Sequence, residues 1–390
     1  MLLVSVLLLP ITYFLAKSSV VVYFPSYLIG LSVLALLTTK EFSQVVRQSK
    51  TTLLYVVCFL IYMALSALWS ANPSLKSLGL YLAYILLIIT FVFSFSLLEL
   101  RFPRLVELFL LLLLVSASIS ICYSIHLFQT LGYETPEDDR MYSMGGVSNP
   151  VISALSYGTV FVLSLSFLSQ CKDRILGILI VLMMSIILIG IIYTQTRSVW
   201  VGIVAAFFTL IFVSSKSTFK HKLFQCGLAI LVLLAILTII WMLGYHENLL
   251  ERSTSFRPEI WQEVTRRLPQ DNLLFGYGIA ANPEVHYQHL VFAHPHSIYL
   301  STVFYGGLVG LALFFALLGR LAFVLVRNSN ADLVLVMPLL VYGLVCLIVD
   351  GDKLVRKVNF IWLLVWLPVA LAISQEVKSK LSTQSKPQPG

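Results

Sequence analysis

The chain has 390 residues, of which 59% are hydrophobic and 11% are charged, and its formal net charge is +8 at pH 7. A soluble domain has about 25% charged residues, so this composition excludes an ordinary soluble protein. The basic residues are spread over many short loops rather than gathered on one face, which excludes a nucleic-acid-binding protein.

Apolar runs long enough for transmembrane helices recur along most of the chain. They predict an all-α integral membrane protein, a single polytopic domain over residues 1–390 with about twelve transmembrane helices. The first run lacks a basic flank, so we expect a retained membrane segment rather than a cleaved signal peptide. The predicted spans are 2–16, 19–38, 52–70, 78–98, 105–127, 150–170, 174–193, 198–215, 223–244, 297–326, 332–350 and 358–374.

Lysine and arginine in the short loops predict the orientation of the chain. With the N-terminus in the cytoplasm, the inner loops and the tail carry 14 of the 26 basic residues and almost no acids. We therefore expect both termini on the cytoplasmic side of a bacterial inner membrane. Long loops at 128–149 and 245–296 then face outward, which is the periplasm in a bacterium with two membranes.

The loop 245–296, between the ninth and tenth predicted spans, concentrates residues suited to phosphate chemistry. Arginine binds phosphate in a bidentate manner, and a neutral imidazole accepts protons. We interpret this loop as a periplasmic subdomain that forms part of the active site. Five of the seven histidines and four arginines lie there or at the helix start that follows: His246, His286, His289, His294, His296, Arg252, Arg257, Arg266 and Arg267.

Residues 255–269 predict a short surface helix with Ser255 as its cap and Pro269 just past its end. An apolar stripe predicts that this helix lies in the membrane interface, with Arg257 at headgroup depth. Two interpretations stay open here: simple anchoring of the loop, or binding of a lipid-linked phosphate by Arg257. The stripe consists of Ile260, Trp261, Val264 and Leu268.

Arg197 lies at the mouth of the span 198–215, among the hydrogen-bonding residues 194–198. An arginine in this place often extends to lipid headgroups, which is one interpretation. The other is a substrate-binding role, because a lipid anchor does not need so many polar neighbours.

His296 lies at the mouth of the span 297–326. The positive end of that helix predicts a lowered pKa for His296 and therefore a neutral general base. The alternative is a metal site formed by His286, His289, His294 and His296. No H-E-x-x-H pattern is present, and we predict neither a metal nor a cofactor.

Two further charged segments face outward. Arg140 closes an acidic run, 134–139, and either pairs with those acids or binds a phosphate. The turn 350–357 is interpreted as a solvated turn of paired charges in preference to a substrate site. Its charged residues are Asp350, Asp352, Lys353, Arg356 and Lys357.

Three motifs, in this order and in these loops, resemble the O-antigen ligase/polymerase family of bacterial membrane glycosyltransferases. The resemblance covers about residues 140–370. The first motif is Arg197-x3-Val201, where the family has leucine in place of Val201. The second is Arg257-x3-Trp261, which is followed by Pro269 and the Gly276-x-Gly278 turn. The third is His296-x9-Gly306.

The resemblance implies inverting, metal-independent glycosyl transfer at the periplasmic face. The donor would be a polysaccharide on undecaprenyl pyrophosphate, and the acceptor a sugar hydroxyl of lipid A–core. His296 would be the general base, and Arg197 and Arg257 would bind the pyrophosphate. We predict further substrate-binding residues in the same loops, namely His294, Arg140, Arg266, Arg267 and Trp261.

Two alternative functions stay open. An O-antigen polymerase of the same family would use a similar donor but extend a glycan. A polytopic transporter or flippase would need charged or Gly/Pro-broken helices near the middle of the membrane. Arg320, Glu99 and Glu107 instead lie toward span ends, and the polar residues gather on one surface, which favours an enzyme.

Overall fold

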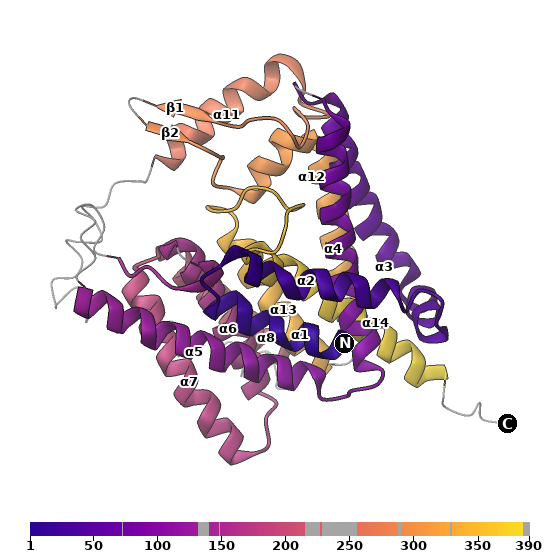
Figure 1. Cartoon of the computed structure of the whole chain (residues 1–390), viewed down its shortest axis with the longest axis vertical. Helices are drawn as coiled ribbons and strands as arrows, with labels where there is room; N and C mark the ends of the chain where they lie inside the picture. Colours follow the sequence, from indigo (N-terminus) through magenta and orange to yellow (C-terminus); the bar gives the residue numbers. More distant parts are fainter. Residues whose placement is uncertain are drawn as a thin grey trace.

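The computed structural model describes residues 1–71, 73–131, 140–147, 149–214, 227, 256–287, 290–327 and 330–384. Within them the chain is nearly all-α, as predicted (Figure 1). The long helices are α1 (Leu2–Leu15), α2 (Ser19–Leu34), α3 (Lys40–Leu65), α4 (Leu75–Glu99), α5 (Leu105–Leu131), α6 (Pro150–Leu168), α7 (Arg174–Thr194), α8 (Arg197–Ser214), α11 (Arg257–Asp271), α12 (Ile298–Arg327), α13 (Asn330–Cys346) and α14 (Leu367–Gln384). The shorter elements are η1 (Ser66–Trp69), η2 (Gly145–Val147), η3 (Trp362–Trp366) and the antiparallel hairpin β1 (Val285–Tyr287) and β2 (Leu290–Phe292).

Six helices of this part of the chain are long and apolar enough to cross a membrane: α3 with η1, α4, α5, α6, α7 and α12. Shorter apolar helices are α1, α2, α8 and α13. Helices therefore stand at eleven of the twelve predicted spans, and the remaining one, 223–244, lies outside the described residues apart from Gly227. The count of twelve spans stays a prediction.

Helix α3 begins at Lys40, well before the predicted start at residue 52. The hydroxyl of Thr39 caps it by accepting a hydrogen bond from the amide of Phe42, with 3.3 Å between the atoms. Polar residues interrupt the apolar run in the first turns but do not interrupt the helix, because Val45 and Gln48 are buried against the rest of the protein.

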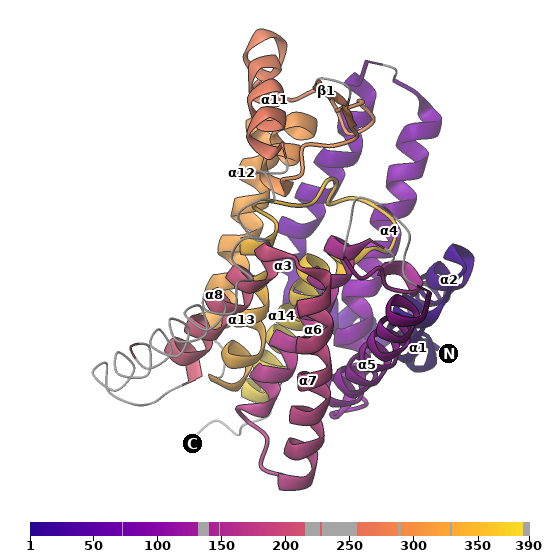
Figure 2. The ribbon, with the colours of Figure 1, turned by 90° about the vertical axis from the view of Figure 1, so that its left-hand side faces the viewer.

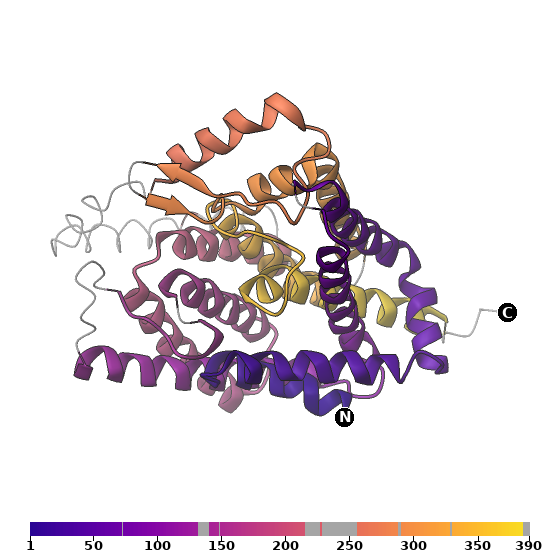
Figure 3. The ribbon, with the colours of Figure 1, turned by 45° about the horizontal axis from the view of Figure 1, so that its top comes forward.

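The helices form two groups that cross one another. Helices α1, α2 and α5 lie side by side, across the direction of α3, α4 and α12 (Figure 1). Helix α11 and the hairpin lie together at one end of the molecule, beyond α12 (Figure 2). Seen from that end, α11 lies beside the hairpin and α12 (Figure 3). Helix α11, which carries Arg257, Arg266 and Arg267, thus lies at this end.

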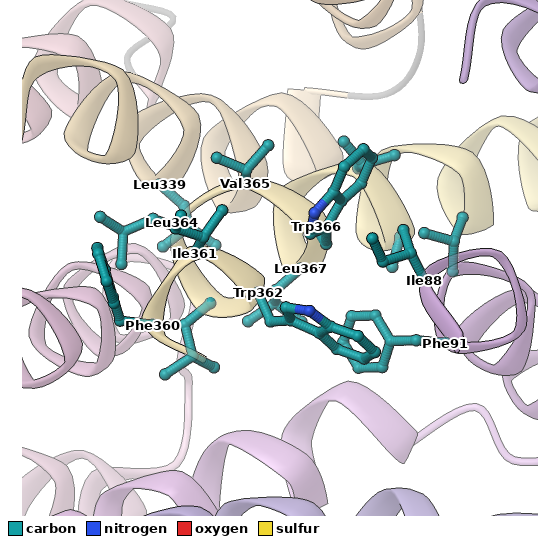
Figure 4. Close-up of a cluster of buried hydrophobic side chains, with 14 of the residues drawn as sticks. Ile88, Phe91, Leu339, Phe360, Ile361, Trp362, Leu364, Val365, Trp366 and Leu367 are labelled. Atoms are coloured by element: carbon teal, nitrogen blue, oxygen red, sulfur yellow. The ribbon is translucent and has the colours of Figure 1, made fainter. Parts of the chain in front are cut away.

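The last helical segment, η3 with α14, is apolar on all sides in its first turns and is surrounded by other helices. Trp362 packs against Phe91, with ring centroids 5.0 Å apart (Figure 4). Its indole donates to the carbonyl of Arg356 at 3.1 Å, and the indole of Trp366 donates to that of Leu354 at 3.0 Å. Two buried tryptophans therefore hold the turn 351–357 against the core.

Helix α12 is kinked at Gly307, whose φ of 64° lies in the left-handed region. The kink lets the next two amides leave the helical pattern. Leu308 and Val309 donate to the carbonyls of Leu273 and Leu274, at 2.9 and 3.2 Å. The segment that follows α11 is therefore fastened to the bend in α12.

A buried charge network joins α3, α12 and α14. Glu376 is 2% exposed and accepts from Arg320 at 2.6 Å, from Thr52 at 2.6 Å and from Lys380 at 2.8 Å. A charged residue inside a membrane helix is costly unless it is paired. This carboxylate therefore compensates two cations and holds three helices together.

The substitution Glu376→Gln should lower the free energy of unfolding by about 3 kcal/mol, because Arg320 and Lys380 would remain without a counter-charge. Unfolding in mixed micelles, followed by circular dichroism, measures the change. Glu41→Gln is the matched control, since Glu41 pairs with Arg101 at an exposed site where a pair contributes about 0–1 kcal/mol. Equal losses in the two variants would contradict the structural role of Glu376.

Candidate active site

The turn between α7 and α8 brings Arg140 and Arg197 together. Gln195 adopts a left-handed conformation with φ of 51°, which reverses the chain and makes Arg197 the first residue of α8. Arg140 donates to the carbonyl of Thr194 and to the hydroxyl of Thr196, both at 2.9 Å. The segment that carries Arg140 is thereby tied to the turn that carries Arg197.

Helix α11 begins with Arg257 and Pro258, after Phe256 in a left-handed conformation with φ of 54°. One turn later, the indole of Trp261 donates to the carbonyl of Pro295 at 2.9 Å. This bond fixes the start of α11 against the His294–Pro295–His296 segment. Trp261 thus holds the loop in place, and its predicted substrate contact stays a prediction.

The apolar stripe of α11 packs on protein rather than facing lipid, and the interfacial placement of the helix stays a prediction. Ile260 and Val264 are fully buried and Leu268 is 4% exposed, because this stripe packs on protein, including β1 and α12. The helix also continues to Asp271, past Pro269, where the sequence predicted its end. The predicted cap Ser255, like residues 245–254, lies outside the described part.

His296 is partly buried just before α12, in a left-handed conformation with φ of 51°. Its ring lies 4.0 Å from that of His294, measured between centroids, and its amide donates to Nδ1 of His294 at 3.3 Å. Burial, then the charges of His294 and Arg257, lowers the pKa of His296 to about 3. The imidazole is therefore neutral, as predicted, although burial rather than the helix end is the main cause.

Asp350 supplies the negative charge of this site. The sequence had been interpreted as placing Asp350 in a solvated turn. Its side chain is 7% exposed, and burial raises its pKa while the Gly351 amide and the charges of Arg257, His294 and Arg140 lower it. That interpretation was therefore wrong for Asp350. The available signal was its position as the last residue of the predicted span 332–350.

Other charged side chains of that turn are also held by hydrogen bonds and an ion pair within the protein. The hydroxyl of Tyr305 donates to Asp352 at 2.7 Å, and Lys353 donates to the hydroxyl of Tyr81 at 3.2 Å. Arg356 lies 3.7 Å from Asp352. Paired charges were predicted here, and two membrane helices, α4 and α12, supply the partners that hold them.

Five predicted site residues thus meet at one place, and we call them the arginine–histidine cluster: Arg140, Arg197, Arg257, His294 and His296. Burial lowers the pKa of the Arg257 guanidinium, Asp350 raises it and Arg197 lowers it further. Three guanidiniums with one carboxylate leave a net positive site beside a neutral imidazole. Such a site binds a phosphate ester and accepts a proton.

Arg266 and Arg267 do not join the cluster. They lie near the far end of α11, about 15 Å along the helix from Arg257 at 1.5 Å per residue. Both donate to Glu263, at 2.9 Å, and these hydrogen bonds lower the pKa of Glu263 to about 2. They were predicted to bind substrate, and this role, if they have it, lies away from the cluster and stays a prediction.

No group of three or more histidine, cysteine or acidic side chains is placed to hold a metal ion within the part of the chain that the structure describes. His289 and His246 lie outside it, and His286 is exposed on β1. The metal-independent chemistry predicted from the sequence stays a prediction.

Comparison with known proteins agrees with the motifs. The model of the O-antigen ligase family matches residues 179–315, which include Arg197, Arg257, His294 and His296. The O-antigen ligase of Pseudomonas aeruginosa is 26% identical over 334 residues, which cover 85% of this chain and 79% of that protein. The resemblance expected from the sequence is confirmed.

The pKa of His296 is about 3 in the folded protein, whereas an imidazole in the unfolded chain has a pKa of 6.5. Between pH 3 and pH 6.5, the unfolded chain therefore binds a proton that the folded chain does not. The folded state should therefore lose stability as the pH falls from about 6.5 toward 3. His296→Asn, which tolerates the left-handed backbone, should lose less over the same window. Unfolding at a series of pH values measures the difference, and parallel curves would place the His296 pKa near 6.5.

Proposed function

We propose that this chain, a multi-pass membrane protein that carries an O-antigen ligase domain over residues 179–315, transfers a polysaccharide from undecaprenyl pyrophosphate to a sugar hydroxyl of lipid A–core. The transfer would be inverting and metal-independent, at the periplasmic face of the bacterial inner membrane, and would yield lipopolysaccharide. The convergence of a buried, neutral His296 with Arg257, Arg197 and Asp350 is the observation that supports the proposal.

The arginines of the cluster suit the pyrophosphate of the donor. A guanidinium forms two parallel hydrogen bonds with phosphate oxygens and stays charged at any physiological pH. Partial burial of Arg257 strengthens its attraction for an anion, because less water competes. Charge that develops on the departing pyrophosphate would be stabilised by groups already in position, which is where electrostatic catalysis is most effective.

His296 would accept the proton of the acceptor hydroxyl. As the oxygen attacks the anomeric carbon, the new carbon–oxygen bond forms while the bond to the pyrophosphate oxygen breaks. Undecaprenyl pyrophosphate leaves with the electron pair, and the proton passes from the imidazolium to water. The leaving group needs no protonation, so one base is enough and no carboxylate pair is required.

Asp350 would act as a positioning residue for the cluster. It faces Arg257, Arg140 and His294, so it offsets part of their mutual repulsion when no donor is bound. A net positive charge remains for the pyrophosphate. Burial and the charges of His294 and Arg257 keep His296 neutral before the acceptor binds, so its ring nitrogen is free to take the hydroxyl proton.

One observation speaks for the transporter alternative: the buried pair of Arg320 and Glu376 inside the helix bundle. Transporters use such intramembrane charges. Here the carboxylate also binds Thr52 and Lys380, so it is saturated by structural partners. A polymerase of the same family would share the cluster, and only the product distinguishes it from a ligase.

His296→Asn should reduce transfer by at least about a hundredfold, because a general base contributes about 10²–10⁴ to the rate. The assay mixes purified protein, undecaprenyl-pyrophosphate glycan and lipid A–core in the presence of EDTA, and a gel shift of the core lipid reports the product. His286→Ala, at an exposed histidine of the same loop, is the control. Longer glycan on undecaprenyl pyrophosphate would indicate a polymerase, and no turnover of either lipid by the wild type would contradict both enzymes.

Arg197→Lys should also be strongly impaired, since lysine keeps the charge but loses the planar fork that binds phosphate oxygens. The same gel assay, with donor concentration varied, measures the loss. Arg104→Lys is the matched substitution, at an exposed arginine before α5. Wild-type rates in the Arg197 variant would reduce this residue to a headgroup anchor.

A further inference from the structure

A second concave site lies at the far end of α11 from the arginine–histidine cluster. It is a cavity of about 310 Å³ beside the turn that follows η1. Its larger lining side chains are Arg267, Tyr277, Asn282 and Phe304. The rest of its wall consists of three alanines, among them Ala71. Residues from four separate segments therefore form one cavity, which shares the helix α11 with the candidate active site.

The aromatic wall of this cavity is held rigidly. The hydroxyl of Tyr277 donates to the carbonyl of Arg267 at 2.8 Å, and its amide donates to the carbonyl of Phe304 at 2.8 Å. The rings of Tyr277 and Phe304 lie 5.0 Å apart between centroids. A ligand would meet a preformed apolar face, so little ordering would accompany its binding.

The polar wall offers hydrogen-bond donors. Arg267 donates through Nε to Glu263 and through Nη1 to the carbonyl of Glu284, both at 2.9 Å, and Nη2 has no partner among the described residues. The Oδ1 of Asn282 accepts from the Glu284 amide at 3.3 Å. Its amide nitrogen donates to no described residue.

Glu263 offsets only part of the charge of Arg267, because Arg266 pairs with the same carboxylate. Among the lining residues only Arg267 is charged, so the cavity presents directional N–H donors, one partly compensated cation and an apolar face. A neutral molecule with many hydroxyl oxygens and apolar C–H faces matches this combination better than a phosphate does. Sugar rings have that chemistry, since one face packs on an aromatic ring while the hydroxyls bind polar groups.

We propose that this cavity is a saccharide subsite, and this inference rests on the proposed glycosyl transfer. It lies about 15 Å along α11 from Arg257, so the bound sugar would be a few units away from the bond that is made. Helix α11 would then align the glycan by holding its anionic end at Arg257 and one of its sugars at Arg267. The sugar belongs to either the donor chain or the acceptor core, which share this chemistry.

The test places a large side chain at the edge of the cavity by substitution. Ala71 is exposed, so Ala71→Trp should block the cavity without disturbing the core, and Asn282→Ala removes one donor. Leu75→Trp is the matched control, because Leu75 is 81% exposed and does not line the cavity. We expect Ala71→Trp to raise KM about tenfold for the substrate whose sugar binds there, with kcat nearly unchanged, and Asn282→Ala to raise the same KM by less.

Two arms identify the sugar. KM is measured for donors with long and with single-unit glycans, and for complete and truncated lipid A–core. A KM effect that disappears with the shorter donor assigns the subsite to the donor chain, and one that disappears with truncated core assigns it to the acceptor. Unchanged KM for every substrate in the Ala71 variant overturns the subsite.

A binding readout separates this inference from the proposed function. Delipidated donor glycan and delipidated core oligosaccharide are titrated into the full-length protein and followed by saturation-transfer NMR. Binding to the wild type that is lost in Ala71→Trp but kept in Leu75→Trp supports the subsite even if no transfer occurs. Transfer by the wild type with equal binding in both variants overturns the subsite and leaves the proposed function intact.

Discussion

The organisation of the candidate active site depends on one buried carboxylate, Asp350. Its backbone carbonyl accepts the amide of Ile298 at 3.0 Å, so it caps the start of α12. Its side chain faces Arg257, Arg140 and His294, which come from three other segments. A single residue therefore fixes the helix that follows His296 and supplies the negative charge that lets several cations approach one another out of water.

The turn that follows Asp350 is held in place by buried aromatic side chains. The indoles of Trp362 and Trp366 bind the backbone of the following turn, while Tyr305 and Tyr81 bind the side chains of Asp352 and Lys353. These partners come from the core of the helix bundle. The charged turn 350–357 is thus held by buried aromatic side chains, and the positions of its charges follow from the packing of the helices.

Burial produces chemical properties that exposure would not. His296 is a neutral imidazole because it is largely removed from water beside other cationic groups. Helix α11 places Arg257 in the same environment because its apolar stripe is covered by protein, and the bond from Trp261 to Pro295 fixes its register against the histidines. Its other end carries Arg267, which shares the carboxylate of Glu263 with Arg266, so one short helix presents two chemically distinct surfaces.

The sequence by itself determined the helices and the end of the molecule at which polar residues gather, because hydropathy and loop composition are local properties of the chain. Arg197, Arg257 and His296 could be singled out for that reason. Only the tertiary structure decided that Asp350 is buried, that Trp261 binds Pro295 and that Arg266 and Arg267 pair with Glu263. Except for the pairing within α11, these contacts join segments far apart in the chain, such as residue 140 with 194–196 and residue 350 with 298. Which charge meets which partner, and how much water remains around it, is set by how the helices pack.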